Sequence, residues 1–61
     1  MNSIIARRVT RIGLYLQRVC EDMRRGDAVQ GMADTAELAE QCRRLYCEFE
    51  DVQRKRETSN E

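Results

Sequence analysis

Apolar residues recur along the N-terminal part of the chain at alternating intervals of four and three positions. The series consists of Ile5, Val9, Ile12, Leu16, Val19 and Met23. This spacing is the a/d pattern of an amphipathic helix that packs against another helix. Arg24 and Arg25 follow and suit the negative end of a helix dipole, and Gly26 then suits a C-terminal cap. The pattern therefore predicts a helix over about 3–25 and a tight turn at about 26.

A second apolar series with the same spacing lies in the C-terminal half of the chain. Its members are Leu38, Cys42, Leu45, Phe49 and Val52. Ala39 and Tyr46 add a second stripe beside it, so the apolar arc is wider than a single partner helix requires. A wide arc is typical of a helix that contacts two or more neighbours, as in a helical bundle.

Two positions are candidates for the start of the second helix. Asp27 with Gln30 three residues later resembles a capping box, and so does Asp34 with Glu37. A start at Asp27 places Gly31 inside the helix, at a cost of about 1 kcal/mol relative to alanine. We favour Asp27, which gives a helix over about 27–54, and keep a loop before Asp34 as the alternative.

The fold class that follows is all-α. We expect an antiparallel two-helix hairpin over 1–54 and a flexible polar tail over 55–61. A chain of 61 residues is one small domain at most, and chains near this length often need a disulfide framework, a metal or a second copy to be stable. The hairpin is therefore predicted to self-associate into a four-helix bundle, as a dimer or a higher oligomer, whose core holds the eleven residues of the two apolar series.

The composition argues against several kinds of chemistry. The chain contains no His, and its three cysteines form no CxxC pair, so neither a zinc site nor a closed set of intrachain disulfides is expected. Cys20, Cys42 and Cys47 are interpreted as small core residues in a reducing cytoplasm, with a redox switch through Cys47 as the alternative. No long apolar window predicts a membrane span. We expect a cytoplasmic non-enzyme without catalytic residues, metal or cofactor.

The charges cancel over the whole chain but are segregated along it. Residues 1–25 hold six arginines against two acids, and residues 26–53 hold seven acids against two arginines. Side-by-side helices would let much of this charge pair internally. On the side of the first helix away from its apolar series, however, an outward leucine is surrounded by arginines, with a tyrosine beside them. The predicted partner-binding residues are Arg7, Arg11, Leu14, Tyr15 and Arg18.

The layout resembles the Rop family of plasmid copy-number proteins, which are short helical hairpins. Shared features are the total length, the turn near mid-chain, heptads in both helices and a polar tail. The residues of the second helix that carry the local resemblance are Ala39, Cys42, Leu45, Tyr46, Cys47 and Phe49. This resemblance implies a dimeric four-helix bundle that binds paired RNA stem-loops. The size and the unadorned hairpin are also similar to small phage- or plasmid-encoded regulators, including antirepressors.

The leading hypothesis is a small regulatory protein that oligomerises and binds another protein, such as a transcriptional repressor, and acts by occlusion in the manner of a phage antirepressor. The first alternative is a Rop-like RNA-binding dimer, in which the same arginines contact phosphates. The second alternative is a structural oligomerisation module.

Overall fold

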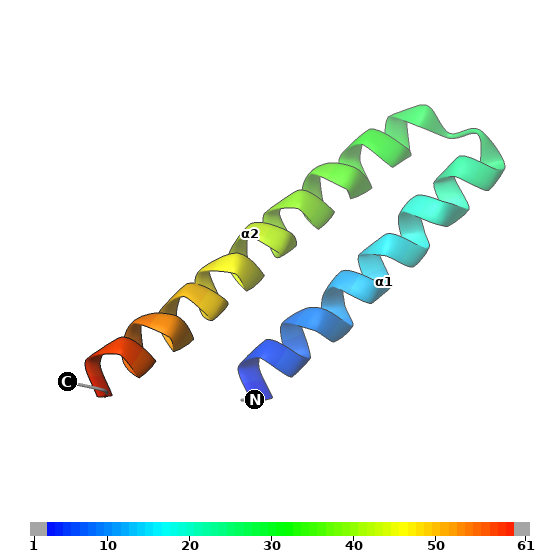
Figure 1. Ribbon diagram of the computed structural model, residues 1–61. Coiled ribbons are helices and arrows are strands. Elements are labelled where there is room, and N and C mark those ends of the chain that lie inside the picture. The colour runs from blue at the N-terminus through cyan, green and yellow to red at the C-terminus, as the bar shows by residue number, and fades with distance from the viewer. Residues whose placement is uncertain (1–2, 60–61) are drawn as a thin grey trace.

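The protein consists of two long α-helices that lie side by side and run in opposite directions (Figure 1). The structure is a computed structural model that describes residues 3–59. Helix α1 spans Ser3–Arg25 and helix α2 spans Ala28–Ser59. No strand occurs within residues 3–59. The structure confirms the predicted all-α hairpin, while its assembly into a four-helix bundle stays a prediction.

The reversal between the helices is made by two residues, Gly26 and Asp27. Gly26 has a φ of 69°, a left-handed conformation that costs glycine little because it lacks a Cβ. The amide of Gly26 donates to the carbonyl of Met23 (3.1 Å), and the amide of Asp27 donates to the carbonyl of Asp22 (2.9 Å). This pair of bonds is a Schellman motif, and it closes α1. Asp27 also caps α2, because its Oδ1 accepts the amide of Gln30 (3.1 Å).

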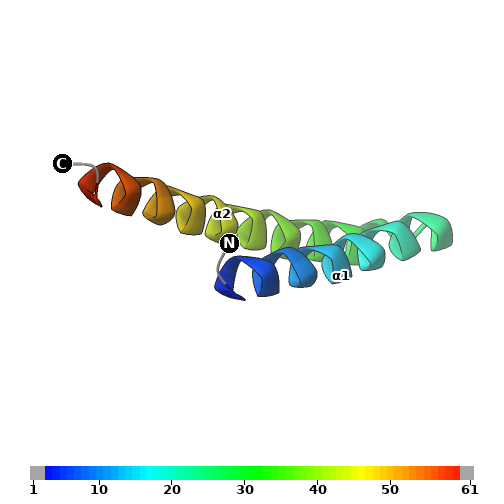
Figure 2. The same ribbon diagram turned by 60° about the horizontal axis from the view of Figure 1, so that its bottom comes forward.

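Helix α2 begins at the earlier of the two candidate positions and ends later than the sequence predicted. Asp34 lies inside α2, so a start at Asp34 is wrong. The helix was expected to end at about 54, yet it continues to Ser59 and extends past the start of α1 (Figure 2). In this stretch Gln53 Nε2 donates to Glu57 Oε1 (3.3 Å) one turn later, which supports helix without any apolar anchor. Residues 60–61 of the expected tail lie outside the described residues.

A narrow seam joins the two helices. On α1 it is formed by Ile5, Arg8, Ile12, Tyr15, Val19 and Asp22. On α2 it is formed by Gly31, Asp34, Leu38, Gln41, Leu45, Glu48 and Val52. Among the described residues, Ile5 is the one apolar residue that is buried, with 3% of its surface exposed. The Cα atoms extend over 53 × 16 × 11 Å, so the hairpin is one helix thick and each helix has a single neighbour.

The two apolar series are divided between this seam and the surface. Six of their eleven residues lie in the seam, namely Ile5, Ile12, Val19, Leu38, Leu45 and Val52. The other five, Val9, Leu16, Met23, Cys42 and Phe49, are exposed in the hairpin. The reason is geometric, because one antiparallel neighbour covers only one row of side chains on each helix. The proposal that all eleven form the core of an oligomer therefore stays a prediction.

Candidate functional site

One side of α1 carries an exposed leucine among arginines that form no ion pair with an acid of residues 3–59. We call Arg7, Arg11, Leu14 and Arg18 the Arg/Leu surface. The Leu14 side chain is 56% exposed. None of the three guanidinium groups forms an ion pair with an acid of the described residues. By contrast, six other arginines do form such pairs: Arg8, Arg24, Arg25, Arg43, Arg44 and Arg54. The structure thus concentrates available cations around one apolar side chain.

Tyr15 is less exposed than the other four predicted partner-binding residues, and its part in partner binding stays a prediction. Its ring is half-buried, and the guanidinium carbon of Arg18 lies 5.2 Å from the ring centroid. A cation stacked on an aromatic face at an exposed site gains about 0.5–1 kcal/mol. Tyr15 therefore contributes to the Arg/Leu surface indirectly, by holding Arg18 in place.

Beside the Arg/Leu surface, near the start of α1, lies a shallow pocket of about 190 Å³. It is lined by Ile4, Arg7, Arg8 and Arg11. The Ile4 side chain is half exposed, whereas Arg8 reaches across the seam to Glu48 (3.3 Å) and leaves its buried Nε without a hydrogen-bond partner. Guanidinium groups around an apolar floor suit a carboxylate that is carried on a partly apolar surface.

Towards the turn, the same side of the hairpin becomes acidic. A hollow of about 690 Å³ is bordered by Leu14 and Arg18 at one end and by Asp22, Asp34 and Asp27 at the other. Asp22 and Asp34 are buried. A hydrogen bond to Asp34, burial and the negative charge of Asp34 together raise the pKa of Asp22. This carboxyl pair between the helices was missed at the sequence level, because seam positions were assigned from apolar residues alone.

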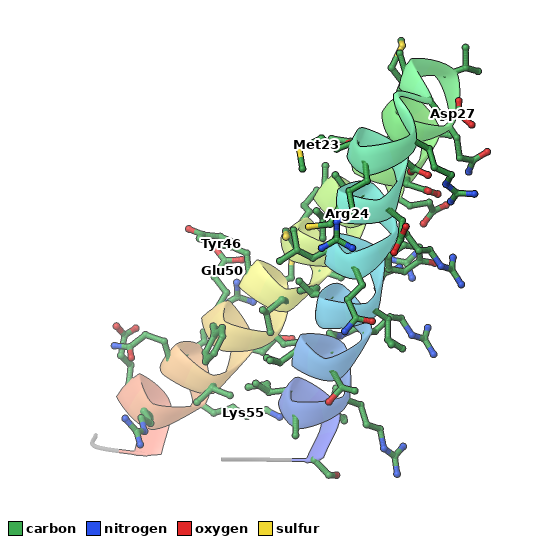
Figure 3. The ribbon with its side chains drawn as sticks, turned by 90° about the vertical axis from the view of Figure 1, so that its right-hand side faces the viewer. Met23, Arg24, Asp27, Tyr46, Glu50 and Lys55 are labelled. Atoms are coloured by element: carbon green, nitrogen blue, oxygen red, sulfur yellow. The ribbon has the colours of Figure 1, made fainter. Side chains whose placement is uncertain are left out.

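The opposite side of the hairpin is apolar, and we call it the apolar face. It comprises Val9, Leu16, Met23, Cys42, Tyr46 and Phe49. Two antiparallel helices are related by a local two-fold axis perpendicular to the plane that contains both of them. Side chains that flank the seam in the same rotational direction on each helix therefore lie on the same side of the hairpin. Figure 3 shows this directly, since Met23 of α1 and Tyr46 of α2 point to one side of the hairpin and Asp27 points to the other. The apolar face and the Arg/Leu surface therefore look in different directions.

The three cysteines are unpaired and differ in position. Cys42 lies on the apolar face and is exposed, and Cys20 is half-buried. Cys47 is also exposed. It lies five residues after Cys42, which places it about 140° further round α2. Within residues 3–59, no group of His, Cys, Asp or Glu side chains is arranged to hold a metal ion.

Comparison with known proteins gives no relative from which a role could be transferred. No family model matches the chain, and no curated protein or solved structure matches it significantly. In the described part of the chain, no helix has both the length and the apolar character needed to cross a bilayer. The functional proposal therefore rests on the surfaces of the hairpin.

Proposed function

We propose that this protein is a small, non-enzymatic regulator of the cytoplasm that assembles into a four-helix bundle and binds another protein through its Arg/Leu surface. Binding would cover a surface that the partner needs, as a phage-type antirepressor covers a repressor. The supporting observation is the group of three arginines around the exposed Leu14, none of which is paired with an acid in the described part of the chain.

One apolar contact and several charges would contribute to binding in different ways. Burying a leucine side chain contributes about 1.5–3 kcal/mol, whereas an exposed ion pair contributes about 0–1 kcal/mol. Leu14 would therefore supply most of the affinity. Arg7, Arg11 and Arg18 would set the orientation and the rate of association with an acidic partner surface.

The proposal is tested by affinity capture with the wild type and with Leu14→Asp. We expect the variant to lose the captured protein partner, with a decrease in affinity of at least about tenfold. Val29→Asp is the matched control, because Val29 is 81% exposed and lies on the other helix. Val29→Asp should retain the partner. If Leu14→Asp binds the partner as tightly as the wild type, the Arg/Leu surface is not the binding site.

The same capture also tests the RNA-binding alternative. The triple variant Arg7→Gln, Arg11→Gln, Arg18→Gln removes the available cations and keeps Leu14. Binding of RNA that weakens steeply with salt and is lost in the triple variant, while Leu14→Asp retains it, would overturn the protein-binding proposal in favour of phosphate recognition.

A further inference from the structure

The apolar face is a continuous surface that the hairpin itself leaves uncovered. Met23 is 73% exposed, Tyr46 is 67% exposed, and Leu16 is 51% exposed. Val9 and Phe49 extend the same surface towards the free ends of the helices. Large exposed side chains gathered in this way are typical of a surface that another protein covers.

The seam beneath this face also needs a cover. Ile12, Val19, Leu38 and Leu45 are only half-buried by the contact between α1 and α2. A second layer of helices on the apolar face would bury the exposed residues and complete the burial of the seam in one step. Two layers of two helices form a four-helix bundle.

We infer that the occupant of the apolar face is a second copy of this chain. This inference rests on the self-association in the proposed function, and it adds that the apolar face is the surface through which the two copies meet. Measured between Cα atoms, the hairpin is 53 Å long and 16 Å wide, so a second hairpin can lie along its whole length. The six residues of the face carry no formal charge. Glu21 and Arg24, which border it beside Leu16, have opposite signs and pair with each other (3.2 Å), so the face can meet its own copy across a two-fold axis.

This arrangement has a consequence for the Arg/Leu surface. Leu14 and Leu16 are two residues apart on α1, so their side chains point about 160° away from each other. A second copy that covers Leu16 leaves Leu14 outside. The assembled protein therefore presents two Arg/Leu surfaces, one on each copy, and can hold two partner molecules or a dimeric partner.

The native cysteines provide the test. Both Cys42 and Cys47 are exposed in the hairpin, but only Cys42 lies on the apolar face. In the purified wild type at high micromolar concentration, alkylation by iodoacetamide should be at least about tenfold slower at Cys42 than in the Leu16→Asp variant. Cys47 should react at the same rate in both proteins. Peptide mass spectrometry measures the two rates in one sample.

Two further measurements keep the test independent of folding and of partner binding. Dilution of the wild type to low micromolar concentration should raise the rate at Cys42 and leave Cys47 unchanged, which needs no variant. Leu14→Asp should keep Cys42 protected even though it abolishes partner binding. The inference is overturned if Cys42 of the wild type reacts as fast as in Leu16→Asp at every concentration, or if Cys47 is the protected thiol. If partner binding fails but Cys42 is protected as expected, the inference about the apolar face still holds.

Discussion

The carboxyl groups of Asp22 and Asp34 are the least expected contact in the molecule, because two acids occupy facing positions of the seam. Asp22 is 2% exposed, and one of its oxygens, Oδ2, has no hydrogen-bond partner. Arg25 lies 3.6 Å away and partly offsets the repulsion, whereas Asp27 adds to it. The pKa of Asp22 is raised in the folded chain, so as the pH rises the folded state keeps this proton longer than the unfolded state does.

We predict that Asp22→Asn raises the melting temperature at pH 7. A carboxyl whose folded pKa is raised contributes stability below its unfolded value, near 3.8, and loses that contribution as the pH rises through the folded pKa. Asparagine stays neutral, so its advantage should be large at pH 7 and should shrink towards about pH 4. Thermal unfolding followed by circular dichroism measures both values.

Asp51→Asn is the control for this pH dependence. Asp51 is exposed and pairs with Arg54 at 3.8 Å, and surface pairs of this kind contribute little. We expect no gain from Asp51→Asn at either pH. A melting temperature of Asp22→Asn that is below that of the wild type at pH 7 would show that the carboxyl pair stabilises the turn.

At the scale of the elements, the helices and the turn follow from local signals that the sequence displays. Gly26 could be assigned to the turn because cationic residues precede it and a capping aspartate follows it. The seam could not be predicted in the same way. Arg8 and Val9 are adjacent in the sequence, and because Val9 is the more hydrophobic of the two, the sequence predicts Val9 at the seam. The antiparallel contact instead takes Arg8, which pairs with Glu48 across it.

The Arg/Leu surface was predictable only in part. Arg7, Arg11 and Leu14 are outward because they lie opposite the apolar series, which periodicity alone indicates. The partial burial of Tyr15 depends on the tertiary contact between the helices, and the guanidinium group of Arg18 lies over its ring. The end of α2 depends on side-chain pairs near Gln53 that no apolar pattern marks.

The polar seam leads to a prediction about Gln41. This residue is 5% exposed, and its Oε1 has no hydrogen-bond partner. Gln41→Leu removes the unsatisfied oxygen and continues the row of Leu38 and Leu45, so the free energy of unfolding should increase by about 1–2 kcal/mol. Urea denaturation at a fixed protein concentration measures the change. Gln41→Glu should have the opposite effect, and a loss of stability in Gln41→Leu would mean that the amide is satisfied.

At the scale of the whole molecule, the hairpin separates two kinds of surface. One side is apolar and suits a second copy, and the other carries charge around Leu14 and suits a different protein. Because Leu14 and Leu16 are almost equally exposed, at 56% and 51%, the same change to aspartate at each position tests one surface at a time. Each variant therefore serves as the control for the other.

Sedimentation equilibrium of the purified chain measures whether the hairpin self-associates. One chain has a mass of 7.2 kDa. We predict that the wild type and Leu14→Asp sediment at high micromolar concentration with at least twice this mass, and that Leu16→Asp sediments as a single chain. A wild-type protein that is helical, cooperatively folded and 7.2 kDa at high micromolar concentration would rule out the proposed assembly, because a solitary hairpin would then be stable with its apolar face in water.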